Sequence, residues 1–255
     1  MKEYNSGLLK ATGLIQETLI LADMYEEGMS KATLLQRVIE QDALSKATNS
    51  RVKDIIERAF FIRYINVNPK IMGVVKVLRR NYVGLDVLSQ ILLIYTARTN
   101  LILGDFIKSV YFPMYRNGNS IITKERFEDF IKEAIKNGRI VKKWSDITQV
   151  KVIRHLGATL ADFRLVDKTR HILPFPIFDL TANFLVHELH FSGHTEQQII
   201  NAEDWQLFGL TPPQVQKLLE QLAYQGHFIY QNSGEIVRIA WKYTDLIDFA
   251  HGASQ

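Results

Sequence analysis

Cysteine is absent from the 255 residues, which excludes disulfide bonds, thiolate-bound zinc and thiol catalysis. Proline is scarce, with six residues, and 47% of the chain is hydrophobic, so the composition favours a folded protein over a disordered one. The best apolar run, Leu88 to Tyr95, is far shorter than the roughly 20 residues that a membrane-spanning helix needs. The polar start predicts no signal peptide. We therefore expect a soluble, cytoplasmic protein with no membrane partner.

The charged residues are distributed unevenly along the chain. The net charge is +4, but the stretch from His171 to the end holds three Lys or Arg against nine Asp or Glu. That stretch carries −6, so the first 170 residues carry +10. A basic front and an acidic back favour a polyanion as partner of the front, with an ordinary solvated surface as the alternative.

Apolar residues recur at helical spacing over most of the chain. The pattern predicts a helix from Gly7 to Glu27, a second helix capped by Ser30, and a third from about Thr48 to Tyr64. We predict a mainly α protein in three parts: an N-terminal helix-turn-helix-like unit (1–68), a helical middle domain ending in a helix plus a hairpin (69–173), and a C-terminal winged-helix domain with a small β-hairpin (174–255).

The C-terminal domain shows helical stretches followed by two apolar segments around a turn at Asn232 to Gly234. This order is typical of a winged helix. Its presumed recognition helix, Pro212 to Gln225, has Lys217 as its only cation. Because the domain is acidic, we expect it to contact protein or to dimerise rather than to bind DNA, although the sequence leaves this open.

The start of the third helix is the first candidate DNA-binding segment. Helix-turn-helix proteins place the first residues of a recognition helix against base edges. Lysine and arginine suit phosphates, asparagine suits adenine, and hydroxyl groups at a helix start bind phosphate. An ordinary capped helix with a solvated basic face is the alternative. The candidates are Lys46, Thr48, Asn49, Ser50, Arg51 and Lys53.

A second basic segment precedes and begins a later helix, and a predicted hairpin follows it. A helix plus a basic hairpin suits groove and backbone contacts together. Trp144, within this segment, is expected to be a core anchor rather than a base-stacking residue. The candidates are Lys142, Lys143, Ser145, Gln149, Lys151 and Arg154, with Lys168 and Arg170 of the hairpin.

Motifs for catalysis or metal binding are weak. Four candidate ligands fall within eight residues, but Phe191 occupies the place that a second histidine would need in a zinc hydrolase; the four are His187, Glu188, His190 and His194. We find no glycine-rich phosphate loop and no hydrolase or kinase motif. We therefore expect no metal, no cofactor, no small-molecule substrate and no enzymatic activity.

Several short motifs occur in a suggestive order: TGLIQET at 12–18, LSK at 44–46 before T-x-x-RVK at 48–53, LGDFIKSVY at 103–111, WSDITQVK at 144–151 and LADFRL at 160–165. In order and spacing they resemble the BrxA family of BREX (bacteriophage exclusion) systems, over roughly two thirds of the chain. The resemblance implies a non-catalytic, DNA-binding component of bacterial phage defence. It also implies partners: a methyltransferase, an ATPase and a phosphatase-like protein.

Together these features predict a protein that binds double-stranded DNA mainly through phosphates. Two alternatives remain open. One is an adaptor that holds other defence proteins and touches nucleic acid only incidentally. The other is RNA binding, with bases stacked on exposed aromatic side chains such as Tyr64 or Tyr82.

Overall fold

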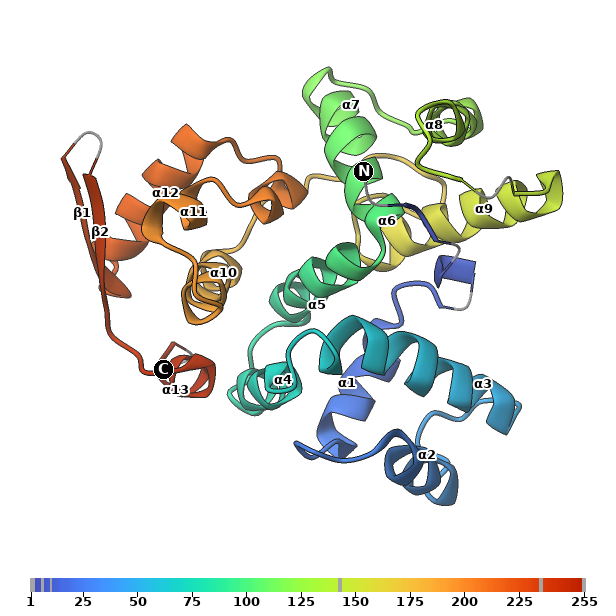
Figure 1. The fold of residues 1–255 in the computed structure, drawn as a ribbon, viewed down its shortest axis with the longest axis horizontal. Coiled ribbons are helices and arrows are strands. Elements are labelled where there is room, and N and C mark those ends of the chain that lie inside the picture. The colour runs from blue at the N-terminus through green and yellow to red at the C-terminus, as the bar shows by residue number, and fades with distance from the viewer. Residues whose placement is uncertain (1–2, 6, 10, 142–143, 234–235, 254–255) are drawn as a thin grey trace. The chain divides into compact units, whose positions relative to one another are not determined.

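The computed structural model describes residues 3–5, 7–9, 11–141, 144–233 and 236–253 (Figure 1). They form a mainly α structure with one small antiparallel sheet near the C-terminus, as the sequence predicted. The chain divides into unit 1, Met1–Met72 with Leu92–Phe175, and unit 2, Gly73–Ile91 with Pro176–Gln255. Of the three predicted domains, the first two fall largely in unit 1 and the third in unit 2, and the three-part division stays a prediction.

Unit 1 begins with short helices joined by tight turns: η1 (Gly7–Leu9), α1 (Ile15–Met24), α2 (Lys31–Glu40), α3 (Asn49–Ile55) and η2 (Ile56–Ile65), a π-helix that continues α3. The predicted Ser30 cap is confirmed, because its side chain accepts a hydrogen bond from the Thr33 amide at 3.1 Å. The predicted helix from Gly7 is wrong over 11–14, where the chain is not helical and Leu14 has a positive φ of 53°.

The rest of unit 1 is a helical assembly around an aromatic core, in which the rings of Phe106 and Phe127 stack at 4.7 Å. The predicted hairpin at 164–173 takes the form of a turn closed by an isolated bridge between Val166 and Ile172. The helices are the end of α5 (Leu85–Thr99), α6 (Leu101–Phe106), η3 (Ile107–Tyr111), α7 (Phe112–Arg116), α8 (Lys124–Lys136) and α9 (Asp146–Asp162). In the part of the chain described, no single helix is both long enough and apolar enough to cross a membrane. Taken together, α5 and the helical stretch Leu101–Arg116 reach that length and apolarity, but the two are bent by 111° relative to each other.

Unit 2 has the predicted order of helices followed by a two-stranded hairpin. Strands β1 (Phe228–Ser233) and β2 (Ile236–Trp241) pair antiparallel, with Phe228 opposite Trp241. Trp205 anchors the core, since its indole N–H donates to the Ile199 carbonyl at 2.7 Å. Unit 2 contains α4 (Ile71–Arg80) from Gly73 onward and α5 as far as Ile91. Its other helices are α10 (Asp179–Phe191), α11 (Glu196–Ile200), η4 (Glu203–Phe208), α12 (Pro212–Tyr224) and α13 (Leu246–Gly252).

Candidate nucleic-acid interface

The first turn of α3 presents polar side chains to solvent. The Thr48 hydroxyl accepts from the Arg51 amide at 3.2 Å, which makes Thr48 the N-cap. Val52 and Ile55 are buried, and they fix which side of the helix faces the interior. The opposite side holds exposed Asn49, Ser50 and Lys53, with Arg51 half-buried beside them.

Lys46, just before α3, has a carboxylate partner inside the protein. Its Nζ lies 2.8 Å from Oε1 of Glu17 on α1. Burial opposes ionisation of Glu17, but the hydrogen bond from Lys46, with the charges of Lys46 and Arg51, outweighs burial, and the pKa of Glu17 is lower than usual. A polyanion would therefore compete with Glu17 for Lys46.

The start of α9 carries the second predicted group. Ser145 caps the helix by accepting from the Thr148 amide at 3.3 Å. The Gln149 amide donates to the Trp144 carbonyl at 3.1 Å, so it is partly occupied, and Trp144 itself is half-buried. Lys151 and Arg154 are exposed. Lys142 and Lys143 lie outside the described residues.

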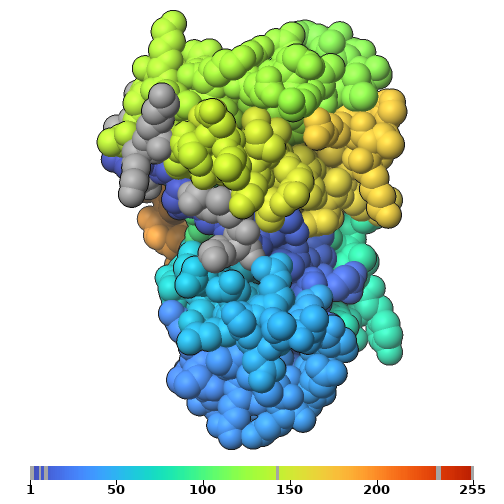
Figure 2. Space-filling view, turned by 90° about the vertical axis from the view of Figure 1, so that its right-hand side faces the viewer, coloured from blue at the N-terminus to red at the C-terminus, as the bar shows by residue number. Residues whose placement is uncertain are grey.

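The cations of α3 and α9 converge on one histidine. His155 is half-buried on α9, and its pKa is lowered mainly by burial and further by the charges of Arg154, Arg51 and Lys151. Arg51 comes from α3, about 100 residues earlier in the chain, so the charge of a residue from each predicted basic segment acts on this imidazole. Figure 2 shows α3, in light blue, and α9, in yellow, on one face of unit 1. We call His155, Arg51, Lys151 and Arg154 the basic cluster.

A buried arginine ties this region together. Arg63, on η2, is only 2% exposed, and its guanidinium donates to the carbonyls of Ala11 at 2.7 Å, Thr12 at 2.6 Å and Gly13 at 3.4 Å. The Gly13 amide in turn donates to Oδ2 of Asp162, the last residue of α9, at 2.8 Å. The segment 11–13 thus connects the helix that continues α3 with the end of α9.

Lys168 and Arg170 lie in the turn that follows α9. Lys168 is exposed. The Arg170 guanidinium stands 5.3 Å from the centre of the Phe127 ring on α8, a cation–π contact. Its charge also helps to keep the pKa of Glu125 low, behind the larger effects of backbone and Thr123 hydrogen bonds. Arg170 therefore already interacts with two residues of α8.

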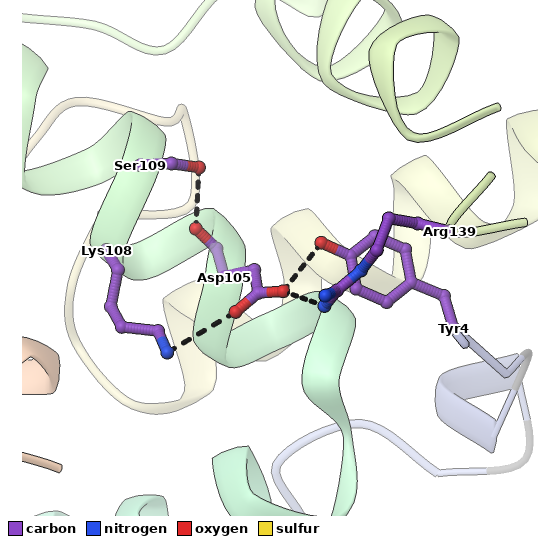
Figure 3. A network of polar contacts seen from close by, with 5 residues as sticks. All are labelled: Tyr4, Asp105, Lys108, Ser109 and Arg139. Atoms are coloured by element: carbon purple, nitrogen blue, oxygen red, sulfur yellow. Dashed lines mark hydrogen bonds and ion pairs between the residues drawn. The ribbon is translucent and has the colours of Figure 1, made fainter. Parts of the chain in front are cut away.

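A second polar network, centred on Asp105, is shown in Figure 3. One carboxylate oxygen accepts from the Tyr4 hydroxyl at 2.8 Å and from Arg139, and the other lies 3.3 Å from Nζ of Lys108. Burial, followed by the hydrogen bond to Asp105, raises the pKa of Tyr4. The Arg139 guanidinium also stacks 4.4 Å from the Tyr4 ring centre. The Ser109 hydroxyl completes the network by donating to the Asp105 carbonyl at 2.7 Å. The network attaches the N-terminal segment to α6. Because Arg139 and Lys108 are paired with Asp105, they contribute little to a binding surface.

In unit 2, His187 is buried among aromatic rings rather than placed for metal binding. Its Nδ1 donates to the Asn183 carbonyl at 2.8 Å, and the Phe249 ring stacks on it at 4.7 Å. Burial lowers the pKa of His187 to about 4. His190 stacks on Trp241 at 3.8 Å.

Of the two aromatic residues suggested for RNA stacking, Tyr64 was wrong. It is fully buried, and its hydroxyl lies 3.1 Å from that of Thr96. Tyr82 is 96% exposed, as the suggestion required. The sequence did not single out three residues that are central to the contacts described above, namely His155, Arg63 and Asp105.

Comparisons with known proteins place the chain in a family. A solved structure described as an uncharacterized protein from Magnetospirillum magneticum is similar, with a TM-score of 0.60 and 15% identity over 79% of this chain and 98% of that one. At that identity the likeness shows the fold alone. The search of curated proteins gave no match. The family model described as BrxA matches residues 2–188, well over half of the sequence, and the chain therefore belongs to the BrxA family.

Proposed function

We propose that this BrxA-family member, a component of BREX phage defence, is a non-catalytic protein that binds double-stranded DNA mainly through phosphates. The observation that carries the proposal is the basic cluster. A nitrogen of Arg154, from the second basic segment, lies 3.5 Å from the His155 ring, and the charges of Lys151 and of Arg51, from the first segment, also act on that imidazole. Like charges gathered in this way repel one another, and a polyanion relieves that repulsion.

The neighbouring side chains suit such a role. Asn49, Ser50 and Lys53 are exposed beside Arg51 and extend the surface along α3. Lysine and arginine would neutralise phosphates, the Ser50 hydroxyl would donate to a phosphate oxygen, and Asn49 is the residue type that reads adenine. The proposed contacts of lower weight are Lys46, Thr48, Ser145, Gln149 and Arg170, each of which has a partner in the protein, together with Lys168, Lys142 and Lys143.

The test is a fluorescence-anisotropy titration of a labelled duplex at low salt. Arg51→Glu and Lys151→Glu each reverse one charge of the basic cluster, and we expect each to weaken binding about tenfold or more, equivalent to about 1.4 kcal/mol. The matched control is Lys132→Glu, which reverses an exposed charge on α8 that is paired with Asp129 at 3.4 Å. It should bind within about twofold of wild type. Circular dichroism checks that all three variants fold.

Equal affinities for the cluster variants and wild type would contradict the proposal. Competition by single-stranded RNA that exceeds competition by duplex DNA would favour the RNA alternative instead.

The adaptor alternative is favoured by a different observation, the surface of unit 2. Residues 176–255 of the unit carry −6 and residues 73–91 carry +2, so unit 2 has a net charge of −4, and Tyr224 and Ile229 are 96% and 63% exposed. Exposed aromatic and aliphatic side chains on an acidic domain suit protein contact better than DNA contact. We propose that unit 2, a winged helix by its order of elements, contacts other BREX proteins such as the methyltransferase, the ATPase or the phosphatase-like component. Partner binding through it should survive Arg51→Glu.

A further inference from the structure

The geometry of His155 defines which of its nitrogens carries the hydrogen. Nδ1 lies 3.1 Å from the backbone carbonyl of Leu8. A carbonyl oxygen can only accept, so Nδ1 must donate, and in the neutral ring the lone pair is on Nε2. Nε2 lies 3.5 Å from an Arg154 nitrogen that can only donate. The nitrogen that can take up a proton, Nε2, therefore faces the guanidinium of Arg154.

Among the described residues, the charges that bear on the pKa of His155 are those of three cations. Lys151 and Arg154 belong to its own helix, the charge of Arg51 acts from α3, and the η1 segment contributes the Leu8 carbonyl. The carboxylate of Glu17 on α1 pairs with Lys46 and also feels the charge of Arg51. Burial and these cations together favour the neutral ring in the free protein.

We propose that His155 is a proton-linked phosphate-binding residue of the basic cluster, held by the Leu8 carbonyl through Nδ1 and able to take up a proton on Nε2 when a DNA phosphate binds beside Arg154. This inference rests on the proposed function and deepens it. A phosphate would offset the charges of Arg51, Lys151 and Arg154. Nε2 would then take a proton from solvent and donate to a phosphate oxygen, while Nδ1 keeps its bond to Leu8.

Linkage gives the sign of the effect. Binding raises the pKa of His155, so the complex takes up a proton, and affinity rises as the pH falls from the bound-state pKa towards the free-state pKa. The free-state value lies below 6.5. Each unit by which the bound-state pKa exceeds it strengthens binding about tenfold at low pH. Below both values the dependence vanishes.

The experiment is duplex titration between pH 5.5 and 8, chosen as a range of roughly one unit or more around the ordinary histidine pKa of about 6.5. His155→Gln keeps a donor for Leu8 but cannot take up a proton. The matched control is His251→Gln, an exposed histidine of α13 in unit 2. Wild type and the control should gain affinity with falling pH, and His155→Gln should lose most of that gain. Calorimetry in two buffers of different ionisation enthalpy should show uptake of up to one proton, absent in His155→Gln.

A second measurement does not depend on any variant folding. The imidazole resonance of His155, followed by NMR in wild-type protein, should titrate at a higher pH with duplex than without it. Duplex binding with no proton uptake, or with uptake that His155→Gln retains, would overturn this inference and leave the proposed function standing. A wild-type protein that binds no duplex at any pH would overturn both.

Discussion

The role of Arg63 leads to a prediction about stability. Replacing it by methionine keeps a long side chain in the interior but removes the guanidinium that binds the carbonyls of Ala11, Thr12 and Gly13. Those carbonyls come from the only stretch between η1 and α1, which is not helical and cannot satisfy them through helical hydrogen bonds. Loss of the hydrogen bonds from Arg63 should release residues 11–13. It should also weaken the hydrogen bond from the Gly13 amide to Asp162 at the end of α9.

The size of the effect follows from the contacts. Two of the three bonds are short, at 2.6 and 2.7 Å, and a hydrogen bond to a charged group contributes about 1.5–3 kcal/mol. Against this loss, methionine is buried at far lower cost than a guanidinium. We expect Arg63→Met to lower the free energy of unfolding by about 2–5 kcal/mol. For a protein of this size that corresponds to a fall in Tm of very roughly 4–20 °C.

Urea denaturation followed by circular dichroism measures this change. Hydrogen exchange at 11–13 shows whether the segment is released. Arg63→Lys should recover part of the loss, because lysine keeps the charge but lacks the planar fork that reaches several acceptors. The control is Arg58→Met, which breaks an exposed pair with Asp54 at 3.0 Å and should cost less than about 1 kcal/mol. A stability for Arg63→Met within about 0.5 kcal/mol of wild type would refute the reasoning.

Three further predictions concern other parts of the fold. Gly13→Ala should destabilise by about 1–3 kcal/mol in urea denaturation, because its Cβ would lie 2.6 Å from that of Asp162; an unchanged midpoint would contradict the close approach. Asp105→Asn should lower the free energy of unfolding by about 1–3 kcal/mol, since it removes the charge that pairs with Arg139, and a neutral effect would show the network to be unimportant. The His187 pKa of about 4 lies below the unfolded value of 6.5, so the contribution of His187 to the unfolding free energy should be constant above pH 6.5 and fall by about 3 kcal/mol between pH 6.5 and 4. His187→Leu should therefore flatten the pH dependence of the unfolding free energy by about that amount, and a slope equal to that of wild type would assign it to other groups.

Local signals in the sequence were enough to predict many elements. Ser30 and Thr48 begin their helices as predicted, because a cap depends on residues three positions apart. The two strands of the C-terminal hairpin were likewise predicted from apolar stretches, but the predicted turn began too early, because Asn232 and Ser233 belong to β1 and pair with β2. The extent of the first helix was not, since the 11–13 segment is held open by Arg63, about 50 residues away. A single arginine within the apolar run from Ala59 to Ile65 was the available signal for that contact.

The candidate site could be predicted only in pieces. The two basic segments were proposed separately, but the effect of Arg51 on His155 depends on tertiary packing between residues about 100 positions apart, which a single sequence does not show. The pairing of Lys46 with Glu17 was missed for the same reason. His155 comes directly after Arg154 and four residues after Lys151, and that spacing was a usable signal. Tyr64 is four residues after buried Phe60, so helical spacing alone placed it on the inner side.

The most direct test of the account is the slope of log affinity against log salt concentration for a short duplex that holds one protein. If Arg51 of α3 and Arg154 of α9 contact the same duplex, Arg51→Ala and Arg154→Ala should each reduce the slope by about 0.9, and the double variant by about 1.8. A slope that one of the two single variants leaves unchanged would contradict a shared surface. A wild-type slope near zero would contradict phosphate binding altogether.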